Sequence, residues 1–123
     1  MDCADAETTA EFYSQLLGWE ITSRDEPPVP GGASPWLSVR DPNGGVGLLF
    51  QAEAWYEPPV WPEESGRPTK MLHLEIAVDD VDAAVERAVA LGATVAPHQP
   101  HDRDPQELRV MLDPAGHPFC LWK

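Results

Sequence analysis

The sequence predicts an α+β fold made of two βαβββ modules, and three observations support this prediction. The chain has 123 residues, which is the usual size of one domain with a single core. Residues 5–18 align with residues 79–92 at an offset of 74 positions. A DPNG turn at 41–44 aligns with a DPAG turn at 113–116 at an offset of 72 positions. Two matches in the same order indicate a duplicated module.

The second module is predicted as strand, helix and three further strands. Met71 to Val78 is an apolar, β-rich run, and Asp79 or Asp80 can cap the helix that follows it. Gly92 ends that helix, because glycine readily adopts the left-handed conformation of a helix C-terminus. The remaining strands are expected at 93–96, 108–112 and 119–122, with the DPAG turn joining the last two.

The first module repeats this order. We expect a helix from Ala6 to Leu17 that buries Phe12 and Leu16, because these apolar residues recur at helical spacing. Strands are expected at 19–23, 36–40 and 46–51. The first strand retains only its last few residues, so we expect an incomplete N-terminus. The predicted organisation is module one at 1–52, a connector at 53–68 and module two at 69–123.

Charge and composition limit the partners. The chain has 8 Lys and Arg residues against 21 Asp and Glu residues, a net charge of −13. This charge disfavours nucleic acid and anionic membranes, which proteins bind with clustered basic residues. Cys3 and Cys120 do not suffice for a disulfide framework and are expected to be small apolar fillers. No membrane-spanning run or signal peptide is apparent, so a cytoplasmic location is expected.

Four segments carry a family resemblance: FYSQLLGWEI, PPVWPEESGRP, KMLHLEIAVDDVDAAVERAVALGA and RVMLDPAGHPFCLW. On these segments the chain resembles the glyoxalase/bleomycin resistance/extradiol dioxygenase superfamily, also called vicinal oxygen chelate proteins, and within it the glyoxalase-like domain branch. The resemblance implies that the two sheets curl into a cup around a small-molecule cavity, with the helices outside. It implies no particular reaction, because the fold hosts lyases, isomerases, dioxygenases, epimerases and non-catalytic drug-binding proteins.

The resemblance also implies where a metal would bind. Catalytic members hold a divalent Lewis-acid metal with His or Gln from the first strand and Glu from the last strand of each module. His73 occupies the first-strand position of module two, whereas the equivalent in module one would precede Met1. The last-strand position, four residues past the turn glycine, is Leu48 in module one and Cys120 in module two. Because Leu48 cannot ligate and thiolate favours zinc or copper(I), we predict no family-type metal centre. A divalent metal at His73 stays an open alternative.

Strand alternation places two polar side chains on one face of the first strand of module two. Leu72, Leu74, Ile76 and Val78 share an apolar face expected to pack on the helices. His73 and Glu75 then project into the cup, where they act as a general base with its orienting partner, bind a cationic group, or form a hydrogen-bonded polar pair. The family pattern directs Cys120 toward the cup, and Trp122 with it, to stack on a ligand or to cap the end of the sheet.

The central strands give conflicting assignments. Leu37 and Val39 look core-facing in module one, yet their offset partners are Arg109 and Met111, whereas 108, 110 and 112 look core-facing in module two. Arg109 is therefore either a charge in the cavity, where it could pair with Glu75, or a surface residue.

Aromatic residues are concentrated in the Pro-rich connector, among them Trp55 and Trp61. They either seal the seam between the modules or a dimer interface, or they form a flat wall for a ring-containing ligand. Neighbouring glutamates favour a cation beside such rings. The residues predicted to contact a ligand are Phe50, Trp55, Trp61, Arg109, Cys120 and Trp122, and the catalytic candidates are His73 and Glu75.

These features predict a protein that binds a small cationic or aromatic ligand in the cup without a family-type metal centre. The resemblance to the bleomycin-binding branch implies a homodimer. The alternative is a metal-dependent lyase, isomerase or dioxygenase with a non-standard centre around His73. A third reading is a sensor or scaffold that binds a common metabolite. The sequence leaves open whether any reaction is catalysed.

Overall fold

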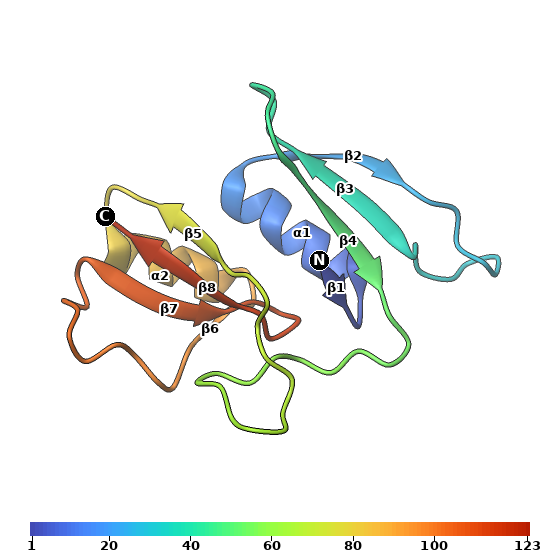
Figure 1. Cartoon of the computed structure of the whole chain (residues 1–123). Coiled ribbons are helices and arrows are strands. Elements are labelled where there is room, and N and C mark those ends of the chain that lie inside the picture. The colour runs from blue at the N-terminus through green and yellow to red at the C-terminus, as the bar shows by residue number, and fades with distance from the viewer. The chain divides into compact units, whose positions relative to one another are not determined.

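The structure, a computed structural model, describes all 123 residues and divides them into two compact units, Met1–Glu57 and Pro58–Lys123. Each unit has one helix and one mixed four-stranded sheet (Figure 1). The prediction of an α+β fold with two βαβββ modules is therefore confirmed. Neither sheet closes on itself. Neither helix is long and apolar enough to cross a membrane.

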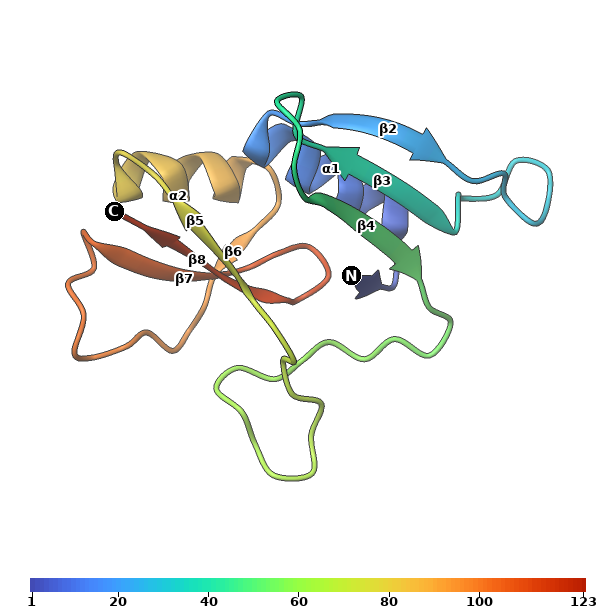
Figure 2. The ribbon, with the colours of Figure 1, turned by 45° about the horizontal axis from the view of Figure 1, so that its top comes forward.

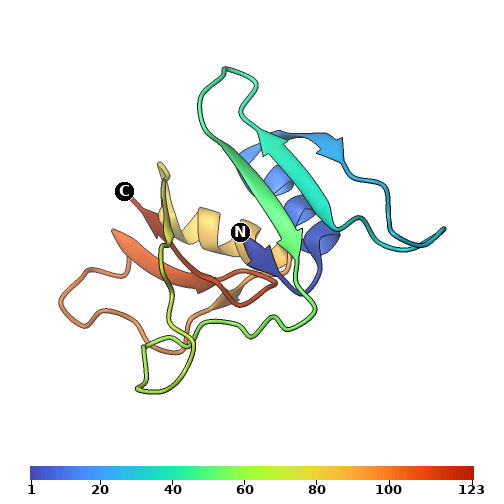
Figure 3. The same cartoon turned by 45° about the vertical axis from the view of Figure 1, so that its right-hand side comes forward.

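Unit 1 begins with the short strand β1 (Asp2–Cys3) and the helix α1 (Ala6–Leu17). Three further strands follow: β2 (Glu20–Arg24), β3 (Trp36–Arg40) and β4 (Gly47–Ala52). Their order in the sheet is β1-β4-β3-β2, with β1 parallel to β4 and the other pairs antiparallel. The helix α1 covers one face of this sheet (Figure 3).

The boundaries of α1 agree with the prediction because its two ends carry strong local signals. Asp5 caps the helix: its carboxylate accepts hydrogen bonds from the Glu7 and Thr8 backbone N–H groups and from the Thr8 hydroxyl. Gly18 follows with a φ of 69°, the left-handed conformation that closes a helix. The helix buries Phe12 as expected, but Leu16 is only partly buried, whereas Tyr13 is fully buried.

Unit 2 contains β5 (Leu74–Ala77), α2 (Val81–Ala90), β6 (Thr94–Val95), β7 (Leu108–Leu112) and β8 (Pro118–Trp122). The sheet order is β5-β8-β7-β6, and α2 runs along one face of this sheet (Figure 2). Asp80 caps α2 by accepting a hydrogen bond from the Ala83 N–H, which decides between the two predicted caps.

The strand β5 is shorter than the predicted run from Met71 to Val78. It pairs with β8 in parallel over only four residues, from Leu74 opposite Phe119 to Ala77 opposite Trp122. Residues 71–73 precede this pairing, and Leu72 is largely exposed rather than packed on a helix. A hydrophobic pattern predicts the strand, but its length depends on the partner that supplies the hydrogen bonds.

The two faces of the unit 2 sheet explain the conflict over the central strands. Arg109 pairs with Leu121 and Met111 with Phe119, so these four side chains share the face that packs on α2. The opposite face, which we call the far face, carries Glu75, Leu108, Val110, Leu112, Cys120 and Trp122. Leu37 and Val39 likewise share the helix side of their own sheet with Phe50. The two modules therefore agree, and the conflict arose because the far face of module two carries apolar residues at 108, 110 and 112 as well.

Candidate functional site

The candidate site lies on the far face of unit 2, where β5 and β8 run in parallel. Glu75 lies directly opposite Cys120 in this pairing, and Val110 lies opposite Cys120 on the other side. Because paired residues project from the same face, the register brings a carboxylate and a thiol together. Trp122 follows two positions later on the same face, roughly 6.5–7 Å along the strand.

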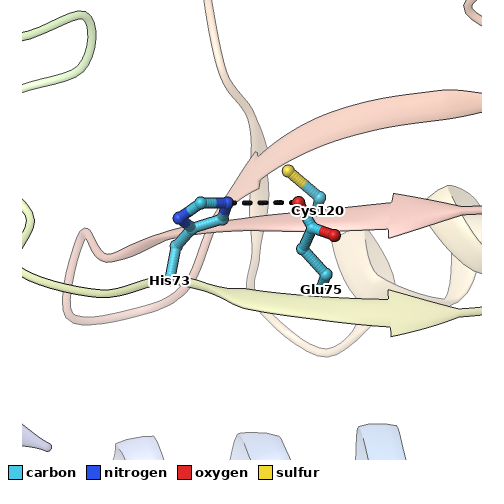
Figure 4. Close-up of side chains that lie close together, drawn as sticks. All are labelled: His73, Glu75 and Cys120. Atoms are coloured by element: carbon cyan, nitrogen blue, oxygen red, sulfur yellow. Dashed lines mark ion pairs between the residues drawn. The ribbon is translucent and has the colours of Figure 1, made fainter.

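His73 joins this pair from the segment that leads into β5 (Figure 4). Its Nε2 lies 3.4 Å from Oε1 of Glu75. One ligand atom each from His73, Glu75 and Cys120 lies within 4.8 Å of the others. The first two side chains are exposed, whereas Cys120 is only 8% exposed. The structure thus brings both catalytic candidates and one predicted ligand contact into a single cluster.

The thiol of Cys120 is in an environment that favours its neutral form. Burial raises the pKa of the Cys120 thiol, the negative charge of Glu75 raises it further, and the Lys70 ammonium acts in the opposite direction. Without a bound cation, Cys120 is therefore a poor nucleophile at neutral pH. A divalent ion would replace the thiol proton, because metal ligands bind in their deprotonated form.

Trp61 covers part of the far face beside Cys120. It packs against the buried cluster of Ala96, Val110 and Cys120, and its Nε1–H donates to the His98 carbonyl oxygen at 3.0 Å. Lys70 Nζ lies 4.3 Å from the centroid of the Trp61 ring and 3.3 Å from a Glu63 carboxylate oxygen. Trp61 therefore packs within unit 2, against the far face of its own sheet.

A shallow pocket of about 260 Å³ opens on the same face. Its lining is Glu75, Arg103, Glu107, Leu108, Trp122 and Lys123. Trp122 is 41% exposed and offers the aromatic surface of this pocket. The lining therefore combines an indole ring with carboxylates and basic groups, which is suited to an aromatic molecule that carries polar substituents.

Three predicted ligand contacts lie elsewhere. Phe50 is fully buried and stacks on Tyr13 of α1, with ring centroids 5.5 Å apart, so its ring belongs to the unit 1 core. Arg109 lies on the α2 side of its sheet, where its Nη2 is 3.4 Å from Oδ1 of Asp82 rather than beside Glu75. Trp55 is 94% exposed and does not line the pocket.

The prediction that Leu48 occupies the last-strand position of module one is wrong by one residue. Leu48 pairs with Val39 on the helix side, and Leu49, opposite Ser38, corresponds to Cys120. The cause is the turn: six residues separate the paired Arg40 and Gly47, whereas five separate Leu112 and Pro118. Leu49 is also unable to bind a metal, so the prediction of no family-type carboxylate in module one does not depend on this shift.

Sequence reasoning missed four residues that line the pocket: Arg103, Glu107, Leu108 and Lys123. Leu108 could have been found, because a hairpin closed by the five residues 113–117 places Leu108 opposite Trp122. Arg103 and Glu107 lie in the irregular segment before β7, where no periodicity indicates direction.

Comparison with known proteins identifies relatives over nearly the whole chain. The family model described as the glyoxalase-like domain matches residues 1–122. The putative glyoxylase CFP32 of Mycobacterium tuberculosis is 32% identical over 126 residues, which cover 100% of this chain and 43% of the relative. The anthracycline biosynthesis protein DnrV of Streptomyces peucetius is 27% identical over 97% of this chain and 43% of its own length. The chain thus spans less than half of these curated relatives.

Solved structures show the same fold. TioX from Micromonospora sp. ML1 has a TM-score of 0.59 and 23% identity, over 98% of this chain and 91% of its own. TnmS3, an antibiotic binding protein from Streptomyces sp. CB03234, has a TM-score of 0.54 and 20% identity, over 99% and 90% of the two chains. Together with the paired βαβββ modules, the match to residues 1–122 shows that the chain belongs to the glyoxalase-like domain family.

Proposed function

We propose that the chain binds a small, planar, cationic molecule on the far face of unit 2. The observation that carries the proposal is the position of the exposed Trp122 ring beside the Glu75 and Glu107 carboxylates in one pocket. An aromatic ligand can stack on the indole, and an amine on that ligand can pair with a carboxylate. The net charge of −13 attracts cations to the chain as a whole, whereas the pocket itself holds Arg103 and Lys123 beside its two carboxylates.

Two relatives support a small-molecule role of this kind. TnmS3 is named as an antibiotic binding protein and DnrV as an anthracycline biosynthesis protein. These names concern those proteins, and they guide the choice of a planar aromatic probe here.

A titration with 9-aminoacridine, a planar cation at neutral pH, tests the proposal. Acridine is the matched probe, because it has the same ring system without the positive charge. We expect 9-aminoacridine to bind more tightly than acridine in about 0.15 M salt, a concentration that screens non-specific attraction to an acidic surface. Isothermal titration calorimetry on chelator-treated protein measures both affinities. Equal binding of the two probes, or no binding of either, would overturn the proposal.

A pair of tryptophan variants locates the binding. Trp122→Leu should weaken 9-aminoacridine binding roughly tenfold, because it removes the stacking surface. Trp55→Leu is the matched control, since Trp55 is exposed and lies outside the pocket. An equal loss of affinity in both variants would show that the probe does not bind at Trp122.

A metal-dependent lyase, isomerase or dioxygenase is the second candidate function, and the cluster of His73, Glu75 and Cys120 favours it. A divalent metal held there would supply Lewis-acid chemistry. Mass spectrometry of the bound molecule separates the two candidates. A binding protein returns the molecule unchanged after long incubation, whereas an enzyme converts it at a rate that falls in His73→Ala.

A further inference from the structure

His73, Glu75 and Cys120 form a set of metal-ligand side chains that comes from one module. The parallel register fixes Glu75 opposite Cys120, and His73 precedes Glu75 by two positions. The arrangement implied by the family resemblance takes ligands from both modules and uses a hard carboxylate on the last strand. Here that strand supplies sulfur, and the carboxylate comes from the first strand instead.

The separations suit a small tetrahedral ion. Zinc bound to nitrogen, oxygen and sulfur at its usual distances holds these atoms roughly 3.3–3.6 Å apart. The separation of His73 Nε2 and Glu75 Oε1 is 3.4 Å, which already falls in this range. All three ligand atoms lie within 4.8 Å of one another, so closure on the sulfur needs a movement of about 1 Å. The exposed His73 and Glu75 side chains can make this movement by rotating.

We propose that His73 Nε2, a carboxylate oxygen of Glu75 and the Cys120 thiolate bind one zinc ion. Thiolate and imidazole together select zinc over magnesium, manganese or calcium, which prefer oxygen ligands. Three protein ligands leave the fourth tetrahedral position open, as in catalytic rather than structural zinc sites. This site goes beyond the proposed ligand binding and does not depend on it.

The surroundings of the cluster favour a cation on balance. With zinc bound in place of the thiol proton, the Cys120 thiolate and the Glu75 carboxylate would carry two negative charges, which match one divalent ion. Trp61, Ala96 and Val110 shelter the Cys120 side from water, which strengthens a metal–thiolate bond. Lys70 is the opposing charge near Cys120, but its ammonium is paired with Glu63 and lies over the Trp61 ring.

Competition with a chromophoric chelator tests zinc binding on the reduced full chain. We expect one zinc per chain with a dissociation constant of roughly micromolar or below. His73→Ala, Glu75→Gln and Cys120→Ser should each weaken binding, by roughly 100-fold or more for His73 and Cys120. His101→Ala and Cys3→Ser are matched controls, because they remove the same ligand types outside the cluster and should change nothing.

Cobalt(II) provides a second readout that is independent of any activity. A thiolate bound to cobalt gives an intense near-ultraviolet charge-transfer band, which should be present in the wild type and absent in Cys120→Ser. Unchanged zinc affinity in Cys120→Ser, or a cobalt complex without that band, would overturn the proposal. Where Cys120→Ser fails to fold, unchanged affinity in the exposed-site variants His73→Ala and Glu75→Gln would overturn it equally.

The outcomes separate this inference from the proposed function. Binding of 9-aminoacridine to metal-free protein that takes up no zinc would retain the ligand site and refute the metal site. Zinc binding without any binding of the acridines would retain the metal site and refute the ligand site.

Discussion

Phe50 and Leu49 are adjacent in β4 but face opposite sides of the sheet, and truncating each should have very different effects. The Phe50 ring is fully buried, stacks on Tyr13 and lies opposite the buried Leu37. Replacing a buried Phe with Ala costs about 3–5 kcal/mol, because burial is lost and a cavity remains. Leu49 is 41% exposed, so Leu49→Ala should cost less than about 1 kcal/mol.

Urea denaturation followed by far-ultraviolet circular dichroism measures the difference. With a slope of about 2 kcal/mol per molar urea, Phe50→Ala should lower the midpoint by roughly 2 M. Phe50→Leu, a milder change of roughly 1–2 kcal/mol, is useful if the alanine variant does not fold. It should leave 9-aminoacridine binding unchanged, because the ring lies in the core of unit 1.

The opposite ranking, with Leu49→Ala more damaging than Phe50→Ala, would refute this reasoning. Strand side chains alternate with a period of two, so that result would mean that the register of β4 is wrong by one residue. It would also restore Leu48 as the residue equivalent to Cys120. A loss of ligand affinity in Phe50→Leu without loss of stability would place the ring in a binding site.

Two further predictions follow from the titratable groups. Hydrogen bonds from the Thr8 hydroxyl, the Thr8 N–H and the Glu7 N–H lower the pKa of Asp5, so its stabilisation is present above the unfolded-state pKa and is lost as the pH falls through the folded-state pKa. Asp5→Ala should therefore cost about 1 kcal/mol near pH 7 and less in acid, as measured by urea denaturation at both pH values. Because burial and then Glu75 raise the pKa of the Cys120 thiol, Glu75→Gln should speed its alkylation by iodoacetamide and Lys70→Met should slow it. Peptide mass spectrometry separates Cys120 from Cys3. Alkylation of Cys120 at the wild-type rate in both variants would contradict the assigned effects of Glu75 and Lys70.

The order of the elements could be predicted because duplication and turn chemistry are local signals. Asp5 and Gly18 mark the ends of α1, and the structure places the helix at the predicted residues. The ends of β5 could not be predicted in the same way. They depend on how far β8 runs beside it, which is a contact between residues about 45 positions apart.

The facing of β7 could not be deduced because apolar residues occupy both sides of the unit 2 sheet. Leu108, Val110 and Leu112 look like a core face, yet they lie on the face of the sheet that points away from α2, where they pack with Trp61 from the connector. Arg109 reaches the α2 side and pairs with Asp82 there. Alternation identifies a core face only when the other face meets water, and here the connector covers part of it. The candidate cluster was partly predictable, because strand alternation and the family pattern both predicted that His73, Glu75 and Cys120 project into the cup.

Glu75 lines the pocket and also belongs to the proposed zinc site, so the two binding events should oppose each other when the ligand is cationic. Zinc would neutralise the Glu75 carboxylate that otherwise pairs with the ligand amine. We expect saturating zinc to weaken 9-aminoacridine binding roughly tenfold, and the probe must then weaken zinc binding by the same factor. Acridine, which carries no charge, should bind equally with and without zinc. Calorimetric titrations with and without zinc measure the coupling, and His73→Ala is the control, because zinc should no longer affect the probe in that variant. If zinc binds and 9-aminoacridine retains its full affinity, the amine does not pair with Glu75, and Glu107 becomes the carboxylate that the ligand recognises.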